Sequence, residues 1–140
     1  MTSGSWARAD GSAAGRSDGE RGSAVAEFAL VSALLVALFL GVVQVALALH
    51  VRAVAIDAAA EGARLAARTD HDLGAGAQRT RDLLASALSE RYAGDVVVGT
   101  TRRGGLDLVR VTVTAPLPVV GLLGPSGAMT VEGHAVDESA

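Results

Sequence analysis

The longest apolar segment of the chain runs from Phe28 to Leu49 and contains no charged residue. Only Ser32, Gly41 and Gln44 interrupt it. As a helix, these 22 residues would be roughly 33 Å long, close to a hydrocarbon core of about 30 Å. A buried helix of a soluble protein can be equally apolar, but the rest of this chain is too short to surround one. We therefore predict a transmembrane helix over residues 28–49.

A secretory signal peptide is the alternative interpretation of this segment. Ala46-Leu47-Ala48 matches the small-residue pattern at which such peptides are cleaved. The apolar run is much longer than the usual core of about 7–15 residues, and the charged region before it is long and half acidic. Three arginines precede the run and three follow closely, so the positive charges do not decide its orientation.

A helical pattern continues beyond the apolar run. Val51, Ala55, Ala58, Gly62 and Leu65 recur at alternating spacings of four and three, which places them on one narrow helix face. We expect one helix over residues 23–68, about 69 Å long. Its small residues would let another backbone approach closely. We expect the second half of this helix to pack on the chain's own domain, which otherwise lacks a core.

The remaining residues predict a second helix and a small sheet. A break at Thr69–Gly76, with capping aspartates, precedes a helix over about Ala77–Tyr92. Alternating apolar positions and a glycine-containing turn at 102–105 then predict a hairpin, with a further strand near the C-terminus. The three strands are expected at Asp95–Thr101, Leu106–Thr114 and Met129–Val136. The predicted fold class is α+β: a long N-terminal transmembrane helix, a second helix and a three-stranded antiparallel sheet.

The connection over residues 115–125 is unusually apolar. Its prolines and glycines, and its length, argue against a second membrane helix. It either covers the helix–sheet core or offers a contact surface to a partner, and we favour the cover.

Residues 1–22 have no Leu, Ile, Val or Phe and hold five glycines and four serines. Such a segment cannot bury enough apolar surface to offset its ordering entropy, so we expect it to be disordered. The whole chain is 50% hydrophobic but only 3% aromatic, which suits a membrane helix carrying a thin domain. The expected organisation is therefore 1–22 leader, 23–68 long helix and 69–140 outer α+β domain.

Composition and spacing give no support for an enzyme. The chain has no cysteine, no phosphate-binding loop and no catalytic arrangement of histidines and acids. Asp70-His71-Asp72 could suggest a metal, but it lies on one loop without further ligands nearby. The arginines are scattered, with no stripe to bind nucleic acid. We predict no catalysis, no cofactor, no metal, no small-molecule substrate and no nucleic acid.

Glu27 is a single carboxylate at the front edge of the apolar run. A charged group at a membrane is costly and is a functional candidate by default. It can equally be an interfacial acid that reaches headgroup water near a helix N-terminus. Position alone does not decide between these interpretations.

Two stretches carry a resemblance to a known family. Arg21-Gly22-Ser23-Ala24-Val25-Ala26-Glu27-Phe28, followed directly by an apolar helix, resembles the processing site of class IV prepilins. Asp57-Ala58-Ala59-Ala60-Glu61-Gly62-Ala63-Arg64 is similar to a second stretch of the TadE-like pseudopilins of tight-adherence (Flp-type) pilus systems. Together they cover about residues 21–68. The resemblance implies a pilin-like fold.

The resemblance also implies sites, partners and a location. A prepilin peptidase would cut after Gly22 and leave Ser23 as the new N-terminus. Glu27, at mature position five and followed by Phe28, would neutralise the new amine between neighbouring subunits. The partners would be that peptidase, the lipid bilayer, other pilin or pseudopilin subunits and the pilus or secretion machinery. The protein would cross the cytoplasmic membrane once, with its N-terminus cytoplasmic and its C-terminal domain extracytoplasmic, or enter an extracellular pilus.

An unprocessed single-pass membrane protein with a small extracytoplasmic binding domain is the alternative. In that case Gly22 would have no role in maturation.

Overall fold

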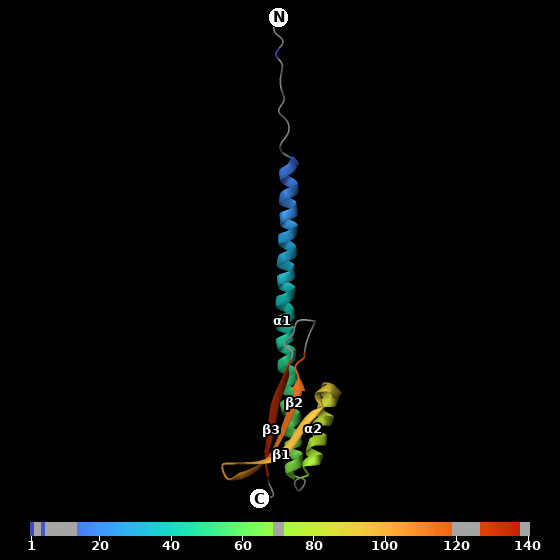
Figure 1. Cartoon of the computed structure of the whole chain (residues 1–140), viewed down its shortest axis with the longest axis vertical. Helices are drawn as coiled ribbons and strands as arrows, with labels where there is room; N and C mark the ends of the chain where they lie inside the picture. The colour runs from blue at the N-terminus through green and yellow to red at the C-terminus, as the bar shows by residue number, and fades with distance from the viewer. Residues whose placement is uncertain (2–3, 5–13, 69–71, 119–126, 138–140) are drawn as a thin grey trace. The chain divides into compact units, whose positions relative to one another are not determined.

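The computed structural model describes residues 1, 4, 14–68, 72–118 and 127–137 (Figure 1). They fall into two compact units, Met1–Leu40 and Gly41–Ala140, which we describe separately. The elements are α1 (Ala14–Arg68), α2 (Leu73–Ala87), the 3-10 helix η1 (Glu90–Tyr92), β1 (Asp95–Arg103), β2 (Leu106–Pro116) and β3 (Ala128–Val136). A long apolar N-terminal helix, a second helix and a three-stranded antiparallel sheet confirm the predicted α+β fold class.

The first unit contains the beginning of α1, which starts at Ala14 rather than at Ser23. Residues 14–22, expected to be disordered, are therefore helical. Once a helix has formed, each added residue gains a hydrogen bond without the cost of a new nucleus. Only four of the residues in this stretch are good helix formers (Ala14, Arg16, Glu20 and Arg21), so the helix that follows accounts for the extension better than the composition does.

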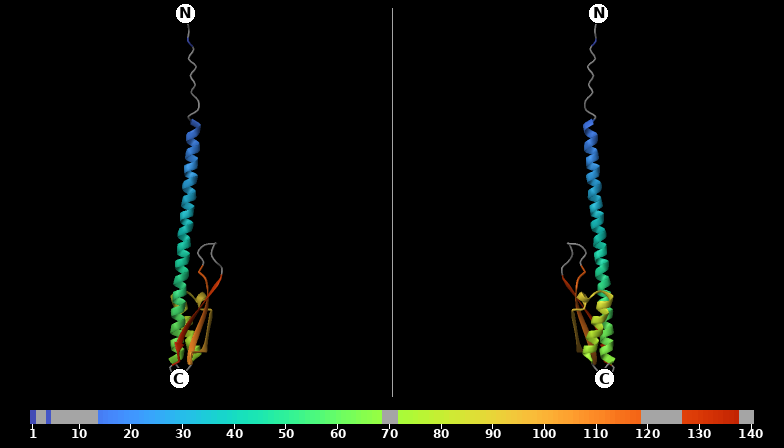
Figure 2. Two further views of the ribbon diagram at one scale, coloured as in Figure 1. Left: turned by 90° about the vertical axis from the view of Figure 1, so that its left-hand side faces the viewer. Right: turned by 90° about the vertical axis from the view of Figure 1, so that its right-hand side faces the viewer.

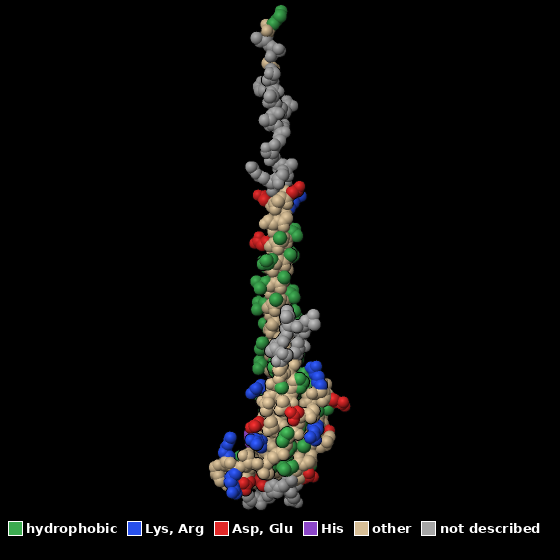
Figure 3. Space-filling model, in the orientation of Figure 1, with side chains coloured by type: hydrophobic (Ala, Val, Ile, Leu, Met, Phe, Trp, Pro, Cys, Tyr) green, Lys and Arg blue, Asp and Glu red, His purple; other side chains and the backbone are tan. Residues whose placement is uncertain are grey.

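Large apolar side chains cover the first unit and are exposed on it (Figure 3). Phe28 is 74% exposed and Phe39 is 66% exposed. A helix that is apolar all round is typical of a membrane span or a buried core. Within the described residues, α1 is the one helix long and apolar enough to cross a membrane, and none of its most apolar window is buried. The prediction of a helix long and apolar enough to span a membrane is therefore confirmed.

The second unit is a sheet in the order β1-β2-β3 with helices on one face (Figures 1 and 2). All neighbouring strands are antiparallel. A two-residue turn joins β1 to β2, and its Gly104 and Gly105 have φ values of 60° and 82°. Only glycine adopts this region readily, which is why the chain reverses here. The strands begin or end one or two residues beyond the predicted bounds.

One face of the sheet packs in the core, as the alternating apolar positions of its strands predicted. Val109, Val111 and Val113 of the central strand are fully buried, while Arg110 between them is exposed. This is the alternation expected of a sheet with one covered face. The apolar core also contains side chains from the other elements: Leu84, Tyr92, Val96, Met129 and Val131.

The predicted helix face of α1 packs within its own domain. Val51, Ala55 and Ala58 are buried, and Gly62 is buried with them. Leu65 is only half-buried. The buried face is wider than predicted because α1 touches two neighbours, the sheet and α2. The additional fully buried residues are Ala59, Ala63 and Ala66.

Glycines let these neighbours approach α1 at backbone distance. A Cβ added to Gly133 of β3 would lie 2.4 Å from the carbonyl carbon of Ala59. A Cβ added to Gly62 would lie 2.6 Å from the carbonyl oxygen of Gly76 in α2. Neither distance leaves room for a methyl group. The thin core therefore depends on close backbone packing rather than on large side chains.

Helix α2 begins and ends earlier than predicted. It starts at Leu73, and the carboxylate of Asp72 accepts a hydrogen bond from the backbone N–H of Ala75 (2.9 Å), a typical N-cap. The expected break thus ends at this cap, and Gly76 lies inside the helix because it packs on α1. At the other end Ser89 is extended, and Tyr92 is buried from η1 rather than from α2.

The described part of the apolar connection after β2 covers the core. Leu117 packs against the buried cluster, and Pro118 is fully buried. The side-chain amide of Gln44 donates a hydrogen bond to the carbonyl oxygen of Pro118. Residues 119–126 lie outside the described part of the chain, so the expectation for them stays a prediction.

Candidate functional site

The predicted processing site lies on an exposed surface of α1. Gly22 and Ser23 are both exposed, and a Cβ added to Gly22 would meet no atom within 4 Å. Three glycines, Gly15, Gly19 and Gly22, fall within the first turns of this helix. Each costs about 1 kcal/mol of helix stability relative to alanine. The peptide bond after Gly22 is therefore accessible, and it lies in a stretch whose helix is easily opened.

Glu27 and Phe28 follow one turn after Ser23 and are exposed. Ser23 and Glu27 are four positions apart, so the helix places them on the same side, with Cβ atoms roughly 5–6 Å apart. Glu27 makes no ion pair with any residue that the structure describes. The carboxylate is thus available to a cation placed beside the front end of the apolar run.

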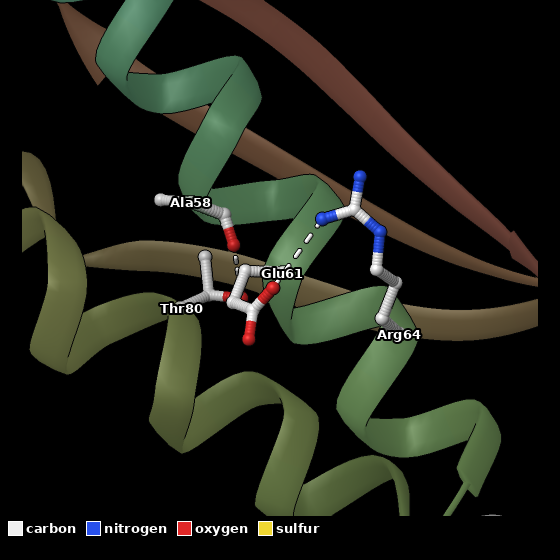
Figure 4. Close-up of polar contacts among 4 residues, drawn as sticks. All are labelled: Ala58, Glu61, Arg64 and Thr80. Carbon is white, nitrogen blue, oxygen red and sulfur yellow. Dashed lines mark hydrogen bonds and ion pairs between the residues drawn. The ribbon is translucent and has the colours of Figure 1, made fainter.

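The second motif stretch, residues 57–64, lies where α1 packs on α2 (Figure 4). Its small residues face inward, and Ala58, Ala59 and Ala63 are buried. Thr80 of α2 is also fully buried against them. Its hydroxyl lies 2.9 Å from the carbonyl oxygen of Gly76 and 3.3 Å from that of Ala58, and it can donate to either. The small residues of this stretch are required by close helix packing.

The charged residues of the same stretch face solvent. The guanidinium of Arg64 lies 3.3 Å from the carboxylate of Glu61, three positions earlier on the helix (Figure 4). Both side chains are about half-exposed, so the pair is worth only a few tenths of a kcal/mol. Asp57 is exposed and has no ion pair within the described residues.

These charged residues border a groove that sequence reasoning missed. It has a volume of about 430 Å³ and lies between α1 and α2. Asp57, Glu61 and Arg64 line it from α1, and Leu83, Ser86 and Ala87 line it from α2. The charged residues of α1 are evident in the sequence, but the sequence does not indicate which residues of α2 lie opposite them.

The structure gives no metal centre among the residues it describes, since no group of three or more metal-binding side chains comes together there. Asp70 and His71 lie outside the described residues, and Asp72 caps α2. His134 lies on β3, with its ring nitrogen 3.8 Å from the carboxylate of Glu132.

The four predicted site residues therefore lie together on one exposed stretch of α1, in the first unit. The groove belongs to the second unit. The two features are built from different parts of the same helix, and each is considered by itself below.

Comparison with protein families gives one match. Residues 22–64 match the model of the family described as TadE-like protein. The matched segment starts at the predicted processing glycine and ends with the arginine of the Glu61–Arg64 pair. Comparisons with curated proteins and with solved structures found no match. The chain thus carries a TadE-like segment over residues 22–64, as the resemblance of its sequence indicated.

Proposed function

We propose that this protein is a membrane-anchored TadE-like pseudopilin or minor pilin. It is cut after Gly22 by a prepilin peptidase and supports assembly of a tight-adherence pilus or a related secretion apparatus. The observation that carries this proposal is the extent of the family match, which begins at Gly22 and continues through the apolar run to residue 64. The exposed Gly22–Ser23 bond is compatible with access by a peptidase.

In this proposal the apolar run remains with the mature chain. Cleavage after Gly22 removes the leader and leaves residues 23–140, with the transmembrane part at 28–49 and the domain at 69–140 outside the cytoplasm. The cleaved protein stays in the membrane until it is assembled, because the apolar helix lies after the cut.

Cleavage also explains the position of Glu27. The new α-amine at Ser23 and the carboxylate of Glu27 would both lie at the membrane interface, where each is poorly solvated. An opposite charge close by favours the charged form of both groups and offsets much of the cost of desolvation. We propose that the amine of one subunit pairs with Glu27 of its neighbour, with Phe28 packed beside the pair.

The test is the mass of the mature chain. The full chain is expressed with and without a prepilin peptidase, extracted from membranes, and analysed by intact mass and N-terminal sequencing. We expect a chain that begins at Ser23 only when the peptidase is present. Gly22→Ala should remain uncut. Gly19→Ala is the matched control, because Gly19 is also an exposed helical glycine with no neighbour within 4 Å, and it should be cut normally.

A mature chain that begins at Met1, or just after Ala46-Leu47-Ala48, would refute the proposal. The first result would favour the unprocessed single-pass protein. That alternative gains some support from the structure, since α1 passes through Gly22 without a break.

The role of Glu27 is tested separately by assembly. Glu27→Gln removes the charge and keeps the shape of the side chain, so we expect normal cleavage but reduced recovery of the protein in sheared pilus fractions. Glu20→Gln is the control, because Glu20 is an exposed acid on the leader side of the cut. Equal recovery of both variants would show that Glu27 does not pair.

A further inference from the structure

The tip of the β1–β2 hairpin carries two arginines, and the structure shows an ion pair within the described residues for one of them. Arg102 and Asp107 are directly opposite in the strand pairing, and Arg102 Nε lies 2.9 Å from the carboxylate of Asp107. A second guanidinium nitrogen lies 3.1 Å from the other carboxylate oxygen. Two contacts of this kind fix the geometry of an ion pair better than one. The neighbouring Arg103 makes no ion pair with any residue that the structure describes.

Arg103 lies beside an exposed leucine. Arg103 pairs with Leu106 across the turn, so their Cβ atoms are roughly 4.5–5.5 Å apart on the same face of the hairpin. Leu106 is 55% exposed. Because side chains alternate along β2, Leu106 points to the face opposite that of Val109 and Val111, which pack in the core. The tip therefore presents a cation and an apolar side chain together, away from the helices.

The groove between α1 and α2 offers complementary chemistry. Its centre is apolar, with Val54, Ala58 and Leu83 among its lining residues. Among the described residues, Glu61 is paired with Arg64, whereas Asp57 at the edge of the groove has no ion pair. A volume of about 430 Å³ lies within the range of about 300–1,000 Å³ that holds small-molecule ligands. It is large enough for a leucine side chain with part of a turn.

We propose that the hairpin tip of one copy of this chain docks in the α1–α2 groove of a second copy. Leu106 enters the apolar part of the groove, and Arg103 pairs with Asp57 at its edge. The tip does not face the groove of its own chain. The groove is lined by exposed residues of the helix layer, Asp57, Arg64 and Ser86, whereas Leu106 lies on the sheet face opposite the core.

The contact joins two different surfaces, the tip and the groove, and we take it to be heterologous. Each copy uses its tip on one neighbour and its groove on another. Such a contact forms rings if its rotation closes and open arrays if it does not. Unlike the proposed pairing of Glu27, this contact does not involve the α-amine that cleavage would create at Ser23. Its test is therefore independent of cleavage after Gly22, and one proposal can fail while the other holds.

Cysteine cross-linking tests the contact in the full chain. The natural sequence has no cysteine, so every cross-link reports an introduced pair. One tagged chain carries Ser86→Cys in the groove, and a second, differently tagged chain carries Leu106→Cys at the tip. Both are purified in detergent and reconstituted together into vesicles. A disulfide needs Cα atoms within about 7 Å, so its formation demands close contact.

We expect the mixed Ser86–Leu106 disulfide dimer and little of either homodimer. Gln78→Cys replaces Ser86→Cys in the control, because Gln78 is an exposed residue of α2 outside the groove. A mixed yield no higher than that of the Gln78 control would overturn the proposal. Strong homodimers of either single-cysteine chain would instead indicate a tip-to-tip or groove-to-groove contact and would also overturn it.

Charge reversal then tests the pairing itself. Arg103→Asp on the tip chain, or Asp57→Arg on the groove chain, should each lower the mixed yield about fivefold, since an exposed ion pair is worth up to about 1 kcal/mol. Combining the two reversals restores an opposite-charge pair and should recover the yield. Arg52→Asp is the control reversal, because Arg52 is exposed on α1 but does not line the groove. If the combined reversal does not recover the yield, the Arg103–Asp57 pairing is wrong.

Discussion

Gly133→Ala is predicted to destabilise the second unit severely. A methyl group at this position of β3 would lie 2.4 Å from both the carbonyl carbon of Ala59 and the backbone nitrogen of Ala60. Atoms of this kind require more than 3 Å. Both obstacles are helix backbone, so no side-chain rotation can relieve the overlap, and the strand or the helix must move by several tenths of an ångström.

The magnitude follows from the usual cost of overpacking. Extra methyl groups in a packed core cost about 1–3 kcal/mol, and rigid backbone on both sides favours the upper end. A unit of about a hundred residues has a total stability of roughly 5–15 kcal/mol. A loss of about 3 kcal/mol would lower its melting temperature by roughly 12–24 °C.

The assay is thermal unfolding of the full chain in detergent micelles, followed by near-ultraviolet circular dichroism of Tyr92, the chain's one tyrosine, which is buried. Gly99→Ala is the matched control. Gly99 is also a strand glycine, but a Cβ there meets nothing within 4 Å and its φ is not positive. We expect this control to melt at the natural temperature or slightly above, because alanine loses less backbone entropy than glycine. Equal melting of the two variants would refute the close strand–helix approach.

Three further predictions concern single contacts of the same unit, all measured by the same melting assay. Thr80→Val removes a buried hydroxyl at nearly constant shape, so we expect a loss of about 1 kcal/mol and a fall of roughly 4–8 °C; no change would mean that the hydroxyl bonds add nothing. Asp72→Ala removes the N-cap of α2 and should cost about 1 kcal/mol, whereas Asp72→Ser should retain most of that stability. At the hairpin turn, Gly104→Asn should be nearly neutral and Gly105→Val strongly unfavourable, because asparagine tolerates positive φ and valine does not; the reverse order would contradict the turn geometry.

Much of this fold can be predicted from sequence periodicity. An uncharged run of membrane length, a narrow helical repeat and two alternating strands around a glycine turn each specify their own element. The buried triplet of Val109, Val111 and Val113 follows directly from alternation along β2. These signals are local, and the structure agrees with them to within one or two residues for the strands.

The close approaches could not be predicted, because they depend on residues distant in sequence. Gly76 is read as part of a break, since glycine weakens an isolated helix. In the structure that cost is offset by packing against Gly62. Ala59 is equally ambiguous in the sequence, because alanine is compatible with a surface or a core. In the structure it is buried, with Gly133 of β3 packed against its backbone. The groove between α1 and α2 could not be predicted either, because its two walls come from residues distant in sequence.

The candidate processing site was predicted from short motifs alone. Gly22, Ser23, Glu27 and Phe28 make few contacts in the structure, so the fold adds little about their role beyond their exposure. Their interpretation depends on the family match and on the chemistry of a new amine beside a carboxylate. By contrast, the small residues of 57–64 are explained by packing alone.

The contact between Ala59 and Gly133 also sets an order of events during synthesis. The two residues are separated by 74 positions (133 minus 59). At about 5–20 residues per second, the ribosome needs roughly 4–15 s to supply the strand after the helix residue has been made. During that interval the alanine-rich face of α1 is complete but has no β3 to cover it. A chain that stops before β3 would leave Ala59 without its strand neighbour even after α2 has packed on α1, and β3 is therefore the element that completes the cover of this face.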